Sequence, residues 1–225
     1  MIMTMDMISA GSGLYSLREA AQYGRIHPNT LSRWLAGNGS GERVLSLENS
    51  KVITFPDFVQ VLAVRNLRVI HQIPLQKIRD AVNRAMSEFD TTYPLARKHT
   101  TYLFDKQLWI KPEGCGDDIV QISGKDHGQR GISKLMERFM VDVSFDEKTG
   151  LANEYKAFEK PAGKIVMNPK HRFGEPLLEG CGYTPEVLFE AAKTEGSTEA
   201  AAKAYGVSKE QVEVCVDYFD YLLAA

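Results

Sequence analysis

The sequence predicts an α+β protein, and three observations support this fold class. Near the N-terminus, apolar residues recur at helical spacing in two short segments separated by a glycine. From Thr100 onward the pattern changes to runs rich in β-branched and aromatic residues, which favour strands. Toward the C-terminus, several helix-start signals follow one another. The 225 residues are enough for two small domains or one large one.

The first two helices are predicted within residues 15–35, joined by a tight turn. Ser16 can cap the first helix with its hydroxyl, Gly24 is placed to end it in a left-handed conformation, and Pro28 fits the first turn of the second. The inner face of the second helix is formed by Leu31, Trp34 and Leu35. The outward positions are Asn29, Thr30, Ser32 and Arg33. This is the layout of a helix-turn-helix, whose second helix enters a DNA major groove.

Two longer helices are expected after this pair. Residues 37–43 are glycine-rich and predict a flexible loop, and residues 44–55 predict a short strand or wing. A helix over 57–71 follows, broken at Ile73-Pro74. The next helix, over 75–89, carries one apolar stripe formed by Leu75, Ile78, Val82 and Met86.

The middle of the chain predicts a mixture of strands and one short helix. Strands are expected over residues 100–111, 119–123 and 140–145, with residues 152–158 as the hairpin partner of the last of these. Residues 131–138 predict a short helix. Glu159–Gly163, which contains Pro-Ala-Gly, is the best candidate for a linker.

The C-terminal part predicts a three-helix module. Helix caps are expected at Thr184, at Ser197 and at Ser208, where Gln211 completes a capping box. The last helix is predicted to turn five residues inward: Val212, Cys215, Val216, Phe219 and Leu222. Four segments result, namely a disordered start (1–13), a helix-turn-helix domain (14–99), a mixed strand and helix region (100–163) and an acidic three-helix domain (164–225).

Charge is distributed unevenly along the chain. Residues 14–111 hold 14 Lys and Arg against 8 Asp and Glu, whereas residues 112–225 hold 13 against 20. The basic front half can neutralise DNA phosphates. The acidic back half suits either a basic protein surface or simple solvation, and both interpretations remain open.

Composition argues against several other classes of protein. The three cysteines form neither a zinc pattern nor an even disulfide set, and no two of the five histidines are four residues apart. The start is a poor signal peptide and no apolar run reaches membrane-spanning length, so a cytoplasmic location is expected. We therefore predict a protein that is not an enzyme, with no catalytic residue, cofactor or metal ligand.

The predicted DNA contacts follow from side-chain chemistry. Arg33 can bind guanine O6 and N7, and Asn29 can pair with adenine. Phosphate contacts are expected from Thr30, Ser32 and Arg43, and Arg18 completes the predicted set. The alternative is an ordinary helical hairpin with no role in DNA binding.

Two parts of the sequence resemble known families. The first resembles a MerR-like winged helix-turn-helix, on the strength of four motifs: SLREAA (16–21), NTLSRW (29–34), FPDF (55–58) and IRDA (78–81). The C-terminal part is similar to a small domain of unknown function found in many bacterial antitoxins. Its motifs are Asn168-Pro169, FGEP (173–176), Gly180, Pro185, Gly196-Ser197 and AYGVS (204–208). In this order the two parts resemble VapB-type antitoxins, which are partnered with PIN-domain ribonuclease toxins.

The resemblance implies an antitoxin that neutralises a PIN-type ribonuclease toxin and represses its own operon as a dimer. The expected toxin contacts are acidic residues on the outer side of the last helix: Glu210, Glu213, Asp217 and Asp220. An alternative is a MerR-like transcription regulator that binds a small effector in an apolar pocket between Thr100 and Phe158. A third possibility is an adaptor that does not bind DNA.

Overall fold

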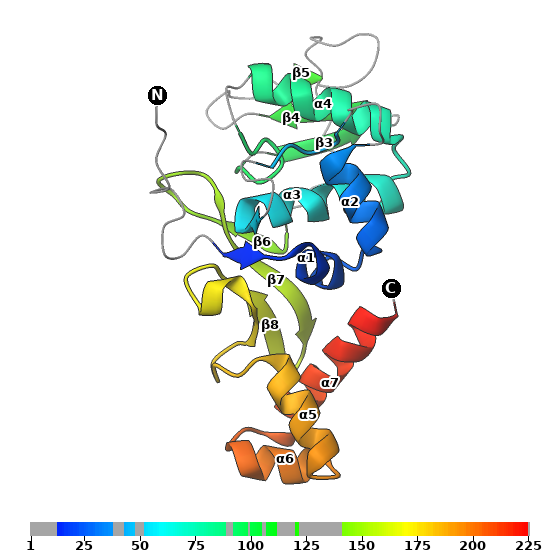
Figure 1. Ribbon diagram of the computed structural model, residues 1–225. Coiled ribbons are helices and arrows are strands. Elements are labelled where there is room, and N and C mark those ends of the chain that lie inside the picture. Colours follow the sequence, from blue (N-terminus) through cyan, green and yellow to red (C-terminus); the bar gives the residue numbers. More distant parts are fainter. Residues whose placement is uncertain are drawn as a thin grey trace, which may run out of the picture. The chain divides into compact units, whose positions relative to one another are not determined.

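The computed structural model describes most of the chain, and Figure 1 shows its elements. The described residues are 13–37, 43–47, 52–88, 92–98, 100–104, 107–111, 120–121 and 141–224. Helices and small sheets are both present, which confirms the α+β class. The predicted disordered start, apart from Gly13, and the predicted helix over 131–138 lie outside the described residues.

The chain forms two compact units, one over Tyr15–Asn153 and another that begins at Glu154. The division falls inside strand β7 (Ala152–Lys160). Glu159–Gly163, expected as a linker, is instead the turn between β7 and β8 (Gly163–Met167), with Lys160 paired to Gly163. The residues Pro-Ala-Gly are common both in tight turns and in linkers. Here they form a turn, because the strand that follows them pairs with the strand that precedes them.

The unit over Tyr15–Asn153 is mainly helical. Strand β1 (Leu14–Tyr15), of which Tyr15 belongs to this unit, pairs with β2 (Ile53–Thr54). The α-helices of the unit are α1 (Leu17–Tyr23), α2 (Pro28–Ala36), α3 (Phe55–Arg65) and α4 (Leu75–Glu88). The predicted helix over 57–71 is thus α3 followed by a π-helical turn, η2 (Asn66–Ile70). Helix α3 is buried on nearly all sides, because eight of its 11 residues are buried: Phe55, Asp57, Phe58, Val59, Gln60, Val61, Ala63 and Val64.

Three short strands follow α4. They are β3 (Thr100–Phe104), β4 (Gln107–Lys111) and β5 (Val120–Gln121), in the order β3-β4-β5. The single strand predicted over 100–111 is therefore a hairpin, in which Phe104 lies opposite Gln107. Strand β6 (Val143–Phe145) turns through Asp146 into β7, as predicted. A four-stranded sheet has the order β6-β7-β8-β9, where β9 is Pro176–Leu178.

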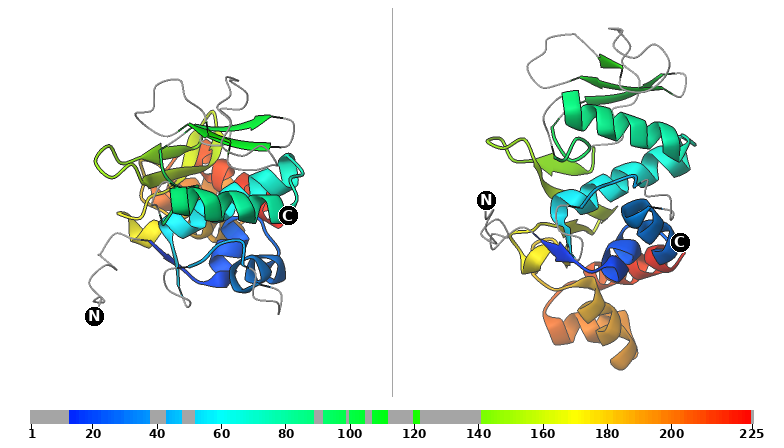
Figure 2. Two further views of the ribbon diagram at one scale, coloured as in Figure 1. Left: turned by 90° about the horizontal axis from the view of Figure 1, so that it is seen from above. Right: turned by 45° about the horizontal axis from the view of Figure 1, so that its top comes forward.

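The second unit packs helices against this sheet. Its helices are α5 (Pro185–Thr194), α6 (Thr198–Tyr205) and α7 (Lys209–Leu223), and their caps are Thr184, Ser197 and Ser208, as predicted. Each of the three helices contacts the other two, α7 also contacts β8, and Figure 2 shows them grouped together in orange and red. The buried face of α7 differs from the prediction, because it includes Val214 and Tyr218. Val216 and Phe219, which were predicted to face inward, are only half-buried.

Cys215 lies at the centre of this packing and is 0% exposed. Burial raises the pKa of its thiol to about 12, with a smaller contribution from Cys181. Because a thiolate is the reactive form, we expect Cys215 to resist modification by a thiol reagent in the native protein, whereas the half-buried Cys181 reacts first. Mass spectrometry of peptides from a Cys115→Ser variant measures both sites. Equal labelling rates under native conditions would contradict the buried position of Cys215.

The same shift makes stability depend on pH. The unfolded thiol loses its proton near the ordinary pKa of 9.0, while the folded thiol keeps it until about 12. The unfolded state therefore binds fewer protons in this window. The free energy of unfolding should fall as the pH rises from 9 toward 12, by up to about 1.4 kcal/mol per pH unit from this group.

Candidate nucleic-acid interface

Helix α1 is fixed at its start by a reciprocal cap. The Ser16 hydroxyl accepts a hydrogen bond from the Glu19 N–H at 3.2 Å, and the Glu19 carboxylate accepts one from the Ser16 N–H at 2.8 Å. Both bonds satisfy amides that lack partners inside the helix. Ala20 and Ala21 are buried, while Arg18 is exposed. The predicted cap is confirmed, and it leaves Arg18 accessible to a ligand.

The turn between α1 and α2 differs from the prediction at one residue. Gly24 is not left-handed, since its φ is −79°, and the left-handed residue is Arg25 with a φ of 51°. Arg65 on α3 donates from Nε to the Arg25 carbonyl at 3.3 Å, a contact between residues 40 apart in sequence. Gly24 is needed for space, because a Cβ there would lie 2.7 Å from the Ala20 carbonyl oxygen.

Replacing Gly24 with alanine should therefore destabilise the turn. The added methyl group cannot avoid a backbone atom without moving α1 away from α2, and overpacking of this kind costs about 1–3 kcal/mol. Urea unfolding followed by circular dichroism measures the change. Gln22→Ala, at an exposed position of the same helix, is the matched control and should be close to neutral. A Gly24→Ala variant as stable as the control would show that the turn relaxes freely.

Helix α2 buries one side and exposes the other. His27 caps it, with Nδ1 accepting from the Asn29 N–H at 3.2 Å, and Pro28 occupies the first turn. The predicted inner face is confirmed, since Leu31, Trp34 and Leu35 are buried. Of the predicted contact residues on this helix, Asn29 and Arg33 are exposed, and Thr30 and Ser32 are half-buried.

Arg33 lies along the exposed side of α2. Its Nε donates to the Asn29 carbonyl at 3.3 Å, and its Nη2 donates to the Thr30 hydroxyl at 3.5 Å. These contacts bring three of the predicted residues together. A guanidinium carries five N–H donors in a planar fork. The two contacts engage only part of this capacity, and both are at the surface, so a base edge or phosphate can compete for the group.

The segment after α2 is attached to the end of that helix. The Trp34 carbonyl accepts from the Val44 N–H at 2.8 Å, and the Arg43 carbonyl accepts from Arg79 Nε on α4 at 2.8 Å. Arg43 itself is exposed. The contact of Arg79 with Arg43 could not be predicted from the sequence, because the two residues are 36 positions apart.

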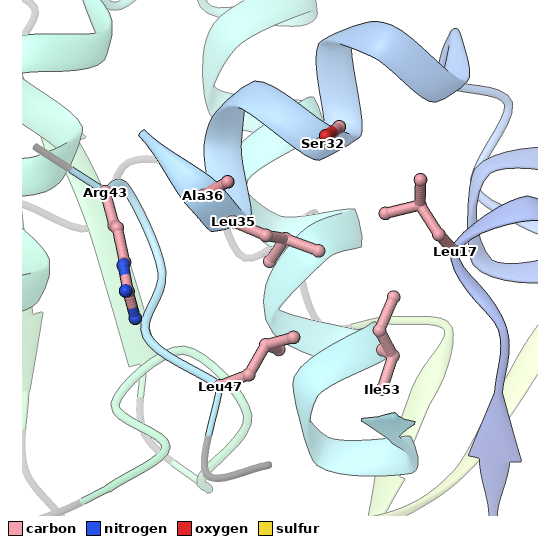
Figure 3. A pocket seen from close by; sticks show the side chains of 7 residues that line it. All are labelled: Leu17, Ser32, Leu35, Ala36, Arg43, Leu47 and Ile53. Atoms are coloured by element: carbon pink, nitrogen blue, oxygen red, sulfur yellow. The ribbon is translucent and has the colours of Figure 1, made fainter. Parts of the chain in front are cut away.

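A pocket of about 260 Å³ lies between α1, α2 and this segment. Figure 3 shows the aliphatic side chains of Leu17, Leu35, Leu47 and Ile53 gathered around a common space, with Ser32 on α2 above it. Ala36 and Arg43 complete the lining. Two of the predicted DNA contacts, Ser32 and Arg43, thus line one pocket. The pocket predicted between Thr100 and Phe158 falls largely on side chains outside the described residues.

The four acidic residues predicted to bind the toxin all lie on α7. Glu210, Glu213 and Asp220 are exposed, and Asp217 is half-buried. Lys160 pairs with Asp217 at 3.0 Å, and Lys209 pairs with Glu213 at 3.6 Å. Hydrogen bonds from its own backbone and from Ser208 lower the pKa of Glu210. Part of the negative charge on this face is therefore neutralised within the protein.

The described residues contain no group of three or more His, Cys, Asp or Glu side chains that could hold a metal ion. Over the same part of the chain, no helix combines the length and the hydropathy needed to cross a membrane.

Comparison with known proteins shows a fold that occurs in other chains. No protein-family model matches this sequence. The uncharacterized protein Rv2308 of Mycobacterium tuberculosis is 23% identical over 202 residues, which is 84% of this chain and 82% of Rv2308. The crystal structure of Rv2018 from the same organism matches with a TM-score of 0.61 and 18% identity, covering 90% of this chain and 96% of that one. At this identity, the structural match indicates a shared fold alone.

Proposed function

We propose that this chain is the antitoxin of a type II toxin–antitoxin system. Residues 14–99 act as a MerR-like winged helix-turn-helix that binds operator DNA as a homodimer and represses the operon. Residues 164–225 form a three-helix domain that binds and neutralises a PIN-type ribonuclease toxin in the cytoplasm. The chain has no catalytic role in this proposal.

The observation that carries the DNA-binding part is the exposed polar face of α2. Asn29 and Arg33 project from a helix whose opposite side is buried, and the capped turn from α1 fixes its direction. A helix held in this way can enter a major groove, with base edges within reach of an amide and a guanidinium. The excess of 14 basic over 8 acidic residues in 14–111 favours a polyanion as the ligand.

Three measurements on the full chain test the proposal. Fluorescence anisotropy with a duplex from the chain's own promoter should show binding that exceeds binding to a scrambled duplex and weakens with salt. Light scattering of the complex should show two copies of the chain. The product of the adjacent gene should co-purify with the chain and lose ribonuclease activity in the complex. Absence of DNA binding, or of any effect on that ribonuclease, would overturn the corresponding part.

The acidic face of α7 gives a prediction for toxin binding. A ribonuclease binds a polyanion, so basic groups are expected near its active site, and an acidic partner would be steered toward them. Changing Glu213 and Asp217 to lysine should slow association at low salt by about tenfold and leave DNA binding intact. The fold should survive, because the surface ion pairs with Lys209 and Lys160 contribute little. Stopped-flow inhibition kinetics measure the rate, and an unchanged rate would identify this face as merely solvated.

A second candidate function is favoured by the pocket beside α2. At about 260 Å³ it is close to the lower size limit of small-molecule sites, and aliphatic side chains dominate its lining together with one serine and one arginine. An effector bound there would contact Ser32 and Arg43 and could change DNA affinity. In this second function, the chain is a transcription regulator that responds to a small effector and has no toxin partner. It predicts DNA release by a small molecule and no effect on the adjacent gene product.

A further inference from the structure

The second unit carries an exposed aromatic side chain on a turn. Phe173 is 66% exposed, the highest value for an aromatic residue in the described part of the chain. It lies in the short 3-10 turn η4 (Arg172–Gly174), drawn in yellow beside β8 in Figure 1. Burying a phenyl ring that is exposed to water is favourable in free energy. Such a residue at the tip of a turn is therefore a candidate anchor for a partner.

The backbone of this turn is strained. Arg172 has a φ of 44° and Phe173 a φ of 56°, so two consecutive residues with side chains occupy the left-handed region. That region favours glycine, and a bulky residue there costs free energy. Strain of this kind persists where the surrounding structure imposes it, and it concentrates at sites of ligand contact.

Hydrogen bonds fix the turn in place. The Asn168 side-chain oxygen accepts from the Lys170 N–H at 3.0 Å, and its amide nitrogen donates to Glu154 on β7 at 3.1 Å. The Gly174 N–H donates to the His171 carbonyl at 2.9 Å. The backbone that carries the ring is thus set before any partner arrives, which reduces the entropy cost of binding.

Cationic side chains precede the ring. Lys170 and Arg172 are exposed, and Arg172 Nε pairs with Glu175 at 3.2 Å. Because a surface pair of this kind is weak, Arg172 can exchange Glu175 for a carboxylate on another molecule. An aromatic ring beside cations is complementary to an apolar pocket with an acidic rim.

We propose that Phe173 anchors a protein–protein interface, with its ring in an apolar pocket of the toxin and with Lys170 and Arg172 against carboxylates at the pocket rim. The inference rests on the proposed function, because it takes the ribonuclease as the partner. It adds a contact surface on the Phe173 turn, apart from the acidic residues of α7.

Charge favours a protein over a nucleic acid as the partner. Residues 154–225 contain 8 Lys and Arg against 12 Asp and Glu, a net charge of −4. A nucleic acid running over this unit would meet repulsion beyond the turn itself. A protein can present a local acidic rim to the turn and other charges elsewhere.

The test uses the full chain and the purified toxin, with the dissociation constant measured by isothermal titration calorimetry. Phe173→Gly removes the ring and also relieves the left-handed strain, so the variant should fold with an unchanged or higher melting temperature. Its affinity for the toxin should fall by about thirtyfold or more, as for an interface hot spot. Phe173→Trp should keep most of the affinity. Val141→Ala is the matched control and should leave the affinity unchanged, because Val141 is 67% exposed and belongs to the unit over Tyr15–Asn153.

Each outcome decides one question. If the wild-type chain binds the toxin and Phe173→Gly binds equally well, the proposed anchor is wrong and the antitoxin function stands. A wild-type chain that does not bind the toxin overturns both. If Phe173→Gly leaves toxin binding intact but loses binding to a single-stranded RNA oligonucleotide, the turn is a nucleic-acid contact and the protein-anchor proposal fails.

Discussion

Replacing Arg33 with alanine is expected to weaken operator binding by about 5- to 150-fold, which corresponds to about 1–3 kcal/mol. The guanidinium lies on the exposed side of α2, where it contacts only the Asn29 carbonyl and the Thr30 hydroxyl within the described structure. A bidentate contact with guanine O6 and N7 would be lost with the side chain, and no neighbouring residue on α2 carries a second guanidinium. Fluorescence anisotropy with the operator duplex measures the loss.

The control for Arg33 must remove the same charge elsewhere. Arg97 is exposed in the same unit and lies outside the α1–α2 pair, so Arg97→Ala changes the net charge equally. A general electrostatic effect would weaken binding in both variants and on all sequences. Base readout by Arg33 would weaken binding in one variant only and reduce discrimination against a substituted guanine. If Arg33→Ala binds the operator as tightly as wild type, α2 is not the recognition helix.

Replacing Phe58 with alanine should produce the largest loss of stability, about 3–5 kcal/mol. The side chain is 0% exposed on α3, and its ring centroid lies 5.0 Å from that of Tyr15. Because α3 is buried on most sides, the cavity left by the ring cannot open to solvent or be filled by a simple shift of the helix. Urea unfolding monitored by circular dichroism measures the free energy.

A matched apolar truncation at the surface provides the comparison. Val69, in the π-helical turn after α3, is 59% exposed, and Val69→Ala should change the free energy of unfolding by less than about 0.5 kcal/mol. Hydrogen exchange in α1 and α2 should accelerate in Phe58→Ala, because α3 holds the turn between these helices through Arg65 and the Arg25 carbonyl. Equal stability of the two variants would mean that the centre of this unit lies elsewhere.

Features that depend on residues a few positions apart could be predicted from the sequence alone. The caps at Ser16, Ser197 and Ser208 were predictable because a side-chain oxygen reaches an amide only two or three residues ahead. The inner face of α2 followed from the helical period, which places Leu31, Trp34 and Leu35 on one side. The identity of the exposed residues Asn29 and Arg33 followed from the same period.

Tertiary structure decided what depends on residues far apart in the chain. Arg25, not Gly24, is left-handed, and its carbonyl accepts a hydrogen bond from Arg65 on α3, while the Arg43 carbonyl accepts one from Arg79 on α4. The segment expected as a linker became a hairpin turn because β8 pairs with β7 across it. Tyr218 and Val214 are buried because α7 packs against both α5 and β8, whereas Val216 and Phe219, which the helical period predicts to face inward, are only half-buried. Local periodicity and capping residues describe a helix in isolation. The pairing of strands and the burial of a second helix face depend on distant segments of the chain, which the local pattern does not specify.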